Sequence, residues 1–500
     1  MTPPSMAPNL FLNCSGQACA RKTNMSKAVG VFATVALATT FLAAQGLPPA
    51  HPNQVPPLQL PLPALTQTDA AGGVPAGTLS STPLRLSLAD AITRGLRQNL
   101  APLLASNMSE QARAQRIAQM AALLPRVDAS ASEVRQKINL AAFGFSFPGA
   151  PQIIGPFNVF QASAAAHVPL LDLSALDSTR AASSLEKAAH DDYQSVRNLV
   201  VLAVANQYLL SVADQSRVQA AQAELATAQS ALQQAQDMLA AGVVDKLSVV
   251  RAQVQRDQQQ QQLTAQQNAL AKQRLSLARA IGLPLAQKFV LTSTTPFATL
   301  PAPAPAAAVA EALATRPDYR ASQQVVRSAQ LLVASAKAGR LPTVSLDGSY
   351  GTIGHELDSN HPIFAVGASI NLPVFAGGQI AAERIRAQAQ LRDAEARTAD
   401  LQAAIGVQVR SALLDLESQH QQVAVAQHAQ QLAHQELTLA QDRFRAGVAD
   451  NLEVIQAQQT VAVGDENYIA ALYGYNLAKA SLAQALGVAA TQFQNYLPTH

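Results

Sequence analysis

The sequence has no tryptophan, only two cysteines, and 4% aromatic residues among its 500. Both cysteines, Cys14 and Cys19, precede a leader-cleavage site that we predict near Gly46. The cleaved chain would then have no cysteine, which excludes disulfides, a thiolate nucleophile and cysteine-ligated zinc. Because no cysteine follows the apolar segment of the leader, we also expect no lipid anchor on an N-terminal cysteine.

Charge is scarce as well, because only 13% of the residues are charged and the formal net charge is +3. The leader carries three basic residues, Arg21, Lys22 and Lys27, and no acidic one, so the cleaved chain is formally neutral. The basic pI of 8.9 therefore does not indicate a nucleic-acid partner. No later stretch has roughly 18 uninterrupted apolar residues, so we expect no membrane-spanning helix after the leader.

Residues 1–46 are predicted to be a signal peptide. A basic segment precedes the apolar run Ala28–Ala44, and small residues stand at Ala44 and Gly46. The alternative is an uncleaved helix or anchor, and Met25 is an alternative start. We expect an exported chain.

The second half of the sequence repeats the first. Four short segments recur in the same order at offsets of about 205 to 217 residues. They are Leu124–Val127 with Leu341–Val344, His167–Leu170 with Asn371–Val374, Ala241–Asp245 with Ala446–Asp450, and Ala280–Gly282 with Ala485–Gly487. A repeat of this length predicts two similar supersecondary units side by side.

Proline-rich stretches divide the chain. We expect a poorly ordered arm at residues 47–83, a first repeat at 84–295 and a second repeat with a C-terminal tail at 296–500. Within each repeat the pattern predicts helix, strand, loop, strand, long helix, turn and long helix. The first helix would start at an N-cap, Ser87, and run to Leu124.

Each strand pair starts after a Leu-Pro, at Pro125 and Pro342, and its return strand ends at Pro169 or Pro373. The return strands are predicted to run about 10 residues, the length of a tilted strand that crosses a bilayer. Their apolar faces are Phe160, Ala162, Ala164, Ala166 and Val168 in the first repeat and Phe364, Val366, Ala368, Ile370 and Leu372 in the second.

This alternation fits either a membrane β-barrel or an ordinary half-buried hairpin. The phenylalanines near the strands, Phe143, Phe145, Phe147, Phe157, Phe160, Phe364 and Phe375, fit either an aromatic girdle or the core of a small sheet. Four strands are too few to close a barrel, so strands that cross a membrane would require an oligomer.

Residues 173–240 contain no proline and predict one helix about 100 Å long. Its apolar residues follow alternating spacings of three and four, which is typical of a coiled-coil seam. They are Val218, Ala221, Leu225, Ala228, Leu232, Ala235 and Leu239, matched by Val423, Ala426, Gln430, Ala433, Leu437, Ala440 and Phe444.

Each long helix is predicted to end at a glycine, Gly242 or Gly447, in a left-handed C-cap. Asp245 and Asp450 would then cap the returning helices, and the spacing of Asp450 and Glu453 predicts a capping box. The sequence thus predicts two tight helical-hairpin tips in each chain.

These residues resemble the TolC-like outer-membrane efflux proteins, also called outer membrane factors, from about Leu86 to Gly487. The resemblance depends on Leu86–Ala91 at the first helix, the repeated Leu-Pro and strand-end prolines, and the repeated tip Ala-Gly-Val-x-Asp. It implies a mainly α fold with membrane β: a trimeric 12-strand β-barrel continued by a 12-helix coiled-coil tunnel, with each chain an internal duplication.

The resemblance also implies a function. The chain would be a passive outer-membrane channel of a tripartite efflux or type I secretion system, extending into the periplasm. Its partners would be two further copies, a periplasmic adaptor (membrane fusion protein), an inner-membrane transporter and outer-membrane lipid. The alternative is a non-conducting periplasmic coiled-coil adaptor or structural protein.

The family's adaptor-docking turn is of a Val-Gly-Leu type. Here it corresponds to the two tips, at Gly242, Val243, Val244, Gly447, Val448 and Ala449. In gated family members a tyrosine and an arginine tether the closed helices, and they correspond to Phe444 and Ala449. Two pore aspartates correspond to Glu453 and Gln456. We therefore expect a weakly latched periplasmic gate at Phe444, Glu453 and Gln456.

No residues suggest catalysis. A phosphate-binding loop, a metal-spaced His/Cys set and a nucleophile elbow are all missing from the sequence. The loop at His355, Glu356, Asp358 and His361 could hold a metal, but a solvated loop is favoured. His420, His428 and His434 do not share one helical stripe and are predicted to be surface residues. We expect no enzyme activity, no cofactor and no metal.

Overall fold

The computed structural model describes residues 70, 72–139, 142, 144, 151–292, 298–356 and 358–497. The chain divides into two compact units, Met1–Gln54 and Val55–His500, and every element below belongs to the second. The predicted signal peptide, most of the arm, and Phe143, Phe145 and Phe147 lie outside the described residues. The domain boundaries at residues 46, 83 and 295 remain predictions.

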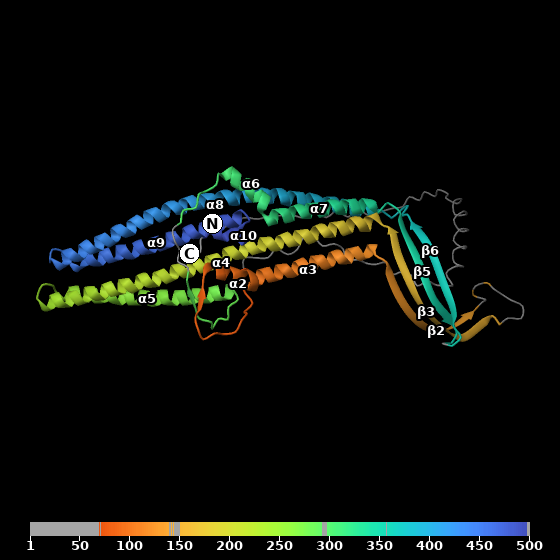
Figure 1. Ribbon diagram of the computed structural model, residues 1–500, viewed down its shortest axis with the longest axis horizontal. Coiled ribbons are helices and arrows are strands. Elements are labelled where there is room, and N and C mark those ends of the chain that lie inside the picture. The colour runs from red at the N-terminus through yellow and green to blue at the C-terminus, as the bar shows by residue number, and fades with distance from the viewer. Residues whose placement is uncertain are drawn as a thin grey trace, which may run out of the picture. The chain divides into compact units, whose positions relative to one another are not determined.

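Both repeats contain two shorter helices, two long strands and two long helices in the same order (Figure 1), and each has further short elements of its own. In the first repeat the elements are β1 (Leu84–Leu86), α2 (Leu88–Gln98), α3 (Leu100–Met120), the 3-10 turn η1 (Ala121–Leu123), β2 (Arg126–Asn139), β3 (Ile153–Leu171), α4 (Leu173–Ala240), α5 (Lys246–Ala280) and β4 (Phe289–Leu291). In the second they are α6 (Pro305–Thr315), α7 (Pro317–Ala338), β5 (Thr343–Gly354), β6 (His361–Asn371), α8 (Gln379–Arg445), α9 (Asn451–Ala485) and α10 (Ala489–Tyr496).

The four long strands form one antiparallel sheet in the order β2-β3-β5-β6. The two strand pairs of the repeats meet where β3 pairs with β5, so β2 and β6 are left as the two edges. β2 and β5 start directly after Pro125 and Pro342, as predicted.

The return strands differ from the prediction in length. β6 has 11 residues, close to the expected ten, but β3 has 19. Pro169 was expected to end this strand, yet pairing continues to Leu171 through a register shift between Pro169 and Leu171. A proline removes one hydrogen-bond donor from the ladder, and the bulge at this point accommodates that loss.

The register gives the sheet two different faces, because side chains of cross-strand partners lie on the same side. Val366 pairs with Gly348, which pairs with Ala166, which pairs with Val127. The face that they share carries Val127, Ala129, Ala131, Ala162, Ala164, Ala166, Val168, Val344, Leu346, Gly348, Tyr350, Phe364, Val366, Ala368 and Ile370. The other face carries Arg126, Asp128, Ser130, Ser132, Gln161, Ser163, His167, Ser345, Asp347, Ser349, Gly367 and Ser369.

The polar face is internally hydrogen-bonded. The imidazole Nδ1 of His167 lies 2.6 Å from Oδ1 of Asp347, and the hydroxyls of Ser345 and Ser369 are 2.8 Å apart. None of the described helices covers the apolar face: Phe364 is 79% exposed, and Val366 and Ile370 are each 73% exposed. An apolar face of this size is typical of a surface that contacts a partner or lipid.

The helix α4 matches the predicted bounds. α4 has 68 residues, which at about 1.5 Å per residue makes it about 100 Å long. α5 returns along α4, and α9 returns along α8, as two antiparallel hairpins (Figure 1). The predicted seams are mostly buried: in α4, Val218, Ala221, Leu225, Ala228 and Ala235 are at most 9% exposed. Leu239 is an exception at 37%, because it lies in the last turn beside the open tip.

One described helix, α4, contains an 18-residue window that by length and composition alone could cross a membrane. The mean hydropathy of this window is 1.4, and half of it is buried inside the chain. The core helix of a packed bundle passes the same test, so the finding is weak evidence for a span.

The predicted single helix from Ser87 to Leu124 is wrong, because it breaks at Asn99. The Asn99 backbone is extended (φ −67°, ψ 143°), and its side chain caps α3 by accepting from the Ala101 N–H at 3.0 Å. The Asn99 amide also donates to the carbonyls of Ala70 and Ala280 at 2.7 and 2.9 Å. The break therefore ties α2 and α3 to the end of α5.

The expectation of a poorly ordered arm does not hold for residues 72–83. The Val74 N–H donates to the Gln98 carbonyl and the Ala76 N–H donates to the Gly282 carbonyl, at 2.8 and 3.0 Å. Gly282 has φ +64°, and a Cβ there would lie 2.6 Å from the Val74 carbonyl oxygen. This part of the arm packs where α5 ends, and β1 and β4 pair in parallel beside it.

Two apolar cores hold the middle of the bundle. The first joins α2, the centre of α4 and the end of α5 around Ile92, Val204 and Tyr208. The second joins α6, α8 and α9 around Ile405, Leu416 and Tyr475. Both cores lie far along the helices from the sheet and from the tips.

Candidate functional site

The two hairpin tips have the same backbone geometry, as predicted. Gly242 and Gly447 adopt φ +72° and +73°. At the first tip the Val243 N–H donates to the Met238 carbonyl at 2.9 Å, and at the second the Val448 N–H donates to the Arg443 carbonyl at 3.1 Å. These are Schellman caps, in which a left-handed glycine lets the chain turn while the last helical carbonyls stay bonded.

The returning helices are capped by the predicted aspartates. Asp245 accepts from the Ser248 N–H at 2.9 Å, and hydrogen bonds from Ser248 lower the pKa of the Asp245 carboxyl. Asp450 accepts from the N–H groups of Leu452 and Glu453 at 3.0 and 3.2 Å.

The predicted capping box at Asp450 and Glu453 is wrong in its second half. The Glu453 carboxylate does not return to the cap backbone; its Oε1 lies 2.9 Å from Nε of Arg443 on α8. An ion pair across the hairpin competes with the local backbone bond, and spacing along one helix cannot reveal that competitor.

The six predicted docking residues lie in two sets of three, one set at each tip. Val243 and Val448 project most, with exposures of 60% and 69%. Val244 is instead half-buried and packs with Met238 against a small cluster of Ala440, Phe444, Val454 and Ala457. Each tip therefore presents one apolar side chain to solvent from a fixed turn.

The three predicted gate residues do not lie in one environment. Phe444 is 2% exposed and fills the cluster between α8 and α9, so its ring is a core group within the chain. Glu453 is half-exposed beside Arg443, and Gln456 is exposed. The resemblance aligns Phe444 with the tethering tyrosine of gated family members, and in this structure Phe444 is an apolar packing residue.

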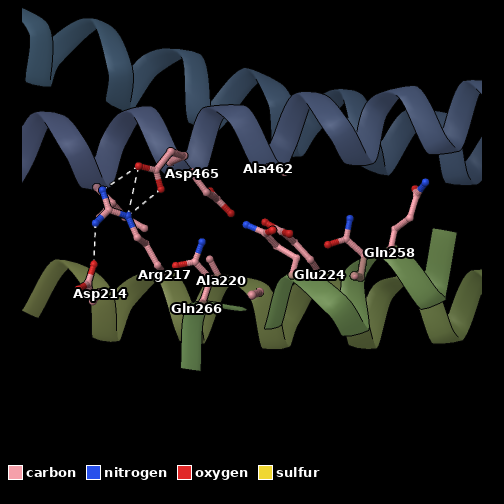
Figure 2. Close-up of a pocket in the computed structure, with 13 residues that line it drawn as sticks. Asp214, Arg217, Ala220, Glu224, Gln258, Gln266, Ala462 and Asp465 are labelled. Atoms are coloured by element: carbon pink, nitrogen blue, oxygen red, sulfur yellow. Dashed lines mark hydrogen bonds and ion pairs between the residues drawn. The ribbon is translucent and has the colours of Figure 1, made fainter. Parts of the chain in front are cut away.

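Sequence reasoning missed an acidic cleft between the two hairpins, midway along their length (Figure 2). The cleft has a volume of about 560 Å³ and lies among α4, α5 and α9. Its charged residues are Asp214, Arg217, Glu224, Asp465 and Glu466, and the glutamine-rich segment of α5 forms another wall. The residues come from both halves of the chain, so no local motif could have identified the cleft.

Arg217 joins the hairpins at one end of this cleft. Its guanidinium donates to both carboxylate oxygens of Glu466, at 2.7 and 2.9 Å, and to Asp214 at 2.8 Å. These bonds, chiefly those to Glu466, raise the pKa of Arg217 above its usual value. In Figure 2, dashed lines join Arg217 to Asp214 on the same helix, α4, and to a carboxylate of α9.

The described residues contain no group of three or more His, Cys, Asp or Glu side chains that could hold a metal ion. Of the predicted surface histidines, His434 is half-exposed beside Asp465, whereas the His420 ring packs 5.7 Å from that of Tyr475. His420 is therefore partly a packing residue.

The one-sided sheet, the two long hairpins and the internal repeat define a class of outer-membrane export proteins. Comparison with known families matches residues 97–283 and 308–488 to the family described as outer membrane efflux protein. The match covers well over half of the sequence. The chain belongs to this family of efflux proteins and is located in the outer membrane.

Individual relatives are distant. The chain is similar to the pyoverdine export outer membrane protein OpmQ of Pseudomonas putida, with 29% identity over 312 residues, 60% of this chain and 64% of that protein. It is 26% identical to the Pseudomonas aeruginosa OpmQ over 75% of this chain and 80% of that protein. The aligned region thus spans slightly less than two thirds of the first relative and four fifths of the second.

Solved structures agree on the fold. The chain superimposes on the outer membrane protein VceC of Vibrio cholerae with a TM-score of 0.69 and 20% identity, covering 80% of this chain and 96% of that one. It superimposes on the CmeC outer membrane channel of Campylobacter jejuni with the same TM-score, covering 87% and 94%.

Proposed function

We propose that this chain forms the outer-membrane channel of a tripartite efflux or type I secretion system. It would act as a passive duct across the periplasm and outer membrane, with no catalytic role. The observation that carries the proposal is the sheet: within the part of the chain that the structure describes, its apolar face is exposed and its edges, β2 and β6, have no partner strand.

Lipid would cover the apolar face of the sheet, and further copies of the chain would pair with its two edge strands. Unpaired strand edges in a membrane leave backbone groups without hydrogen bonds, so only a closed barrel is stable there. About eight strands is the minimum for closure, so four strands per chain require at least two chains, and the three chains that the family resemblance implies would give twelve strands. The polar face, with its hydroxyls and the His167–Asp347 pair, would then line the lumen.

The helical hairpins would continue the barrel as a twelve-helix tunnel into the periplasm. Their tips would dock a periplasmic adaptor that links the duct to an inner-membrane transporter, which supplies the energy. Val243 and Val448 support this role because they are exposed apolar side chains held by rigid caps. The tip would also contain the gate, with Phe444, Glu453 and Gln456.

The assembly can be tested by cross-linking the two sheet edges. Because the cleaved chain has no cysteine, Ser369→Cys on β6 can be combined in turn with Asp128→Cys, Ser130→Cys or Ser132→Cys on β2. We expect at least one pair to give disulfide-linked dimers and trimers in outer-membrane fractions. The control pair, Ser345→Cys with Ser369→Cys, joins neighbouring strands of one chain and should give monomers only.

Monomers from every edge pair, together with recovery of the protein in the soluble periplasmic fraction, would instead support the non-conducting coiled-coil protein.

A further inference from the structure

The cleft between the hairpins adjoins a second, smaller cavity of about 80 Å³. The two cavities share three lining residues, Glu224, Gln259 and Asp465. The smaller cavity is completed by Ala223, Thr227, His434, Leu437, Gln458 and Val461. It therefore lies between α4 and α5 of one hairpin and α8 and α9 of the other.

Gln458 is the unusual residue of this cavity. The side chain is 7% exposed, and among the described residues neither its Oε1 nor its Nε2 has a hydrogen-bond partner. A buried amide left unpaired on both atoms destabilises the folded state, because each atom loses its hydrogen bonds to water and gains none in return. Buried polar groups in folded proteins are almost always satisfied, so a missing group is expected at this position.

The electrostatics of the cavity indicate the charge of that group. Glu224 and Asp465 approach from opposite hairpins, and burial together with the Asp465 charge raises the pKa of Glu224. Oδ1 of Asp465 receives the Gln430 amide at 2.8 Å and lies 3.1 Å from Nε2 of His434. The adjoining Arg217 is already engaged with Asp214 and Glu466, so it does not neutralise this pair. The cavity is rich in acceptors and negative charge.

The remaining wall is aliphatic, with Ala223, Leu437 and Val461. A ligand that complements both the acidic and the aliphatic wall of the cavity has a positively charged group with N–H donors and a short hydrocarbon chain. A protonated alkylamine has this chemistry: its ammonium donates up to three hydrogen bonds, and its methylenes match the aliphatic wall.

We propose that this cavity binds a protonated alkylamine, of the diamine or polyamine class, between Gln458, Glu224 and Asp465. The ammonium donates to Oε1 of Gln458 and to the two carboxylates. Bound there, it offsets the repulsion between the carboxylates and fastens the two hairpins together midway between the Arg217 bridge and the tips. All residues that line the site belong to one chain, so binding there can be measured without an export assay.

The probe for a test is 1,4-diaminobutane dihydrochloride, titrated calorimetrically into the purified full-length protein at pH 7.5. We expect one site per chain. Gln458→Leu removes both unpaired atoms and retains an apolar core residue, so it should fold at least as well as the wild type. Both Gln458→Leu and Glu224→Gln should weaken binding about tenfold or more, since the first removes a hydrogen-bond acceptor for the ammonium and the second removes the charge of one carboxylate.

The matched control is Glu395→Gln, which removes an exposed carboxylate of α8 away from the cavity and should bind like the wild type. Undiminished binding by Gln458→Leu would overturn the proposal, because the amide would then be satisfied by water alone. If NaCl at matched ionic strength gives the same heat and the same thermal stabilisation as the diamine, the effect is charge screening and the proposal is wrong. Tighter binding of MgCl₂ than of the diamine would identify a metal site instead of an amine site.

Discussion

At the residue scale, Glu453 shows how a tertiary partner overrides a local pattern. Its spacing from Asp450 fits a capping box, yet its carboxylate pairs with Arg443 across the hairpin. Asn99 shows the same effect, because its cap bonds and its two tertiary amide bonds together break a helix that periodicity alone continues. In both cases the deciding partner lies on another element.

The Glu453→Gln variant tests the proposed gate. The Arg443–Glu453 pair is half-exposed, so its loss should cost at most about 1 kcal/mol of stability. If three Glu453 carboxylates surround a narrow axis, the variant should show reduced cation preference in planar bilayers. Glu436→Gln, on the exposed face of α8, should conduct like the wild type. Unchanged ion selectivity in Glu453→Gln would leave Glu453 with the Arg443 pair as its only role.

Lys479 offers a pH-dependent prediction. The side chain is 1% exposed; its Nζ lies 3.3 Å from the Ala298 carbonyl and 4.8 Å from the centre of the Tyr475 ring. Burial lowers the pKa of Lys479 to about 8, so the folded state disfavours the charged form. The resulting penalty is fully present below pH 8 and is lost as the pH rises from about 8 towards the usual value of 10.5.

We therefore expect the wild type to gain thermal stability relative to Lys479→Met between pH 8 and pH 10. The gain should be on the order of 2 kcal/mol, less than the full pKa shift corresponds to, because this pH range covers only part of the titration between the folded and unfolded pKa values. Circular dichroism melts of both proteins in the same detergent measure it. Parallel stability curves at all pH values would show that Lys479 titrates normally.

At the scale of elements, the sequence predicted the regular parts well. The bounds of α4, the starts of β2 and β5, both glycine caps and both aspartate N-caps are as expected, because each depends on periodicity or on a residue with one strong local preference. The extra length of β3, the break before α3 and the packing of residues 72–83 were not predictable. Each depends on contacts with segments up to about 200 residues away, such as the Ala76–Gly282 hydrogen bond.

The alternation of β6 makes a prediction about its two faces. Val366 lies on the uncovered apolar face and Ser369 on the hydrogen-bonded polar face. Val366→Arg should cost about 2–4 kcal/mol if the site is near the middle of the bilayer, and should reduce the yield of heat-modifiable oligomers. Ser369→Arg should assemble more normally but reduce single-channel conductance. Equal tolerance of arginine at both positions would contradict a lipid-facing strand.

At the scale of the whole molecule, the duplication explains why the tips could be predicted from the sequence whereas the cleft between the hairpins could not. The tips recur in the sequence, so their six residues could be named from repetition and resemblance before the structure. The cleft of Arg217, Glu224 and Asp465 arises only where one repeat packs against the other, and neither repeat contains it alone. Pairing the repeats creates the inter-hairpin cleft.

The docking role that we propose for the tips can be tested by changing their two exposed valines. Val243 and Val448 are exposed, and their backbone N–H groups, not their side chains, complete the Schellman caps. Replacing both with tryptophan should therefore preserve the caps and the oligomer while blocking a close-fitting adaptor. We expect export to be abolished in cells, measured as loss of resistance to a pumped solute, with normal amounts of oligomer in the outer membrane. The matched control is Val425→Trp with Val463→Trp, at exposed helix positions away from the tips, which should leave export intact. Normal export with both tips changed would reject the docking role and leave the glycine turns as helix caps.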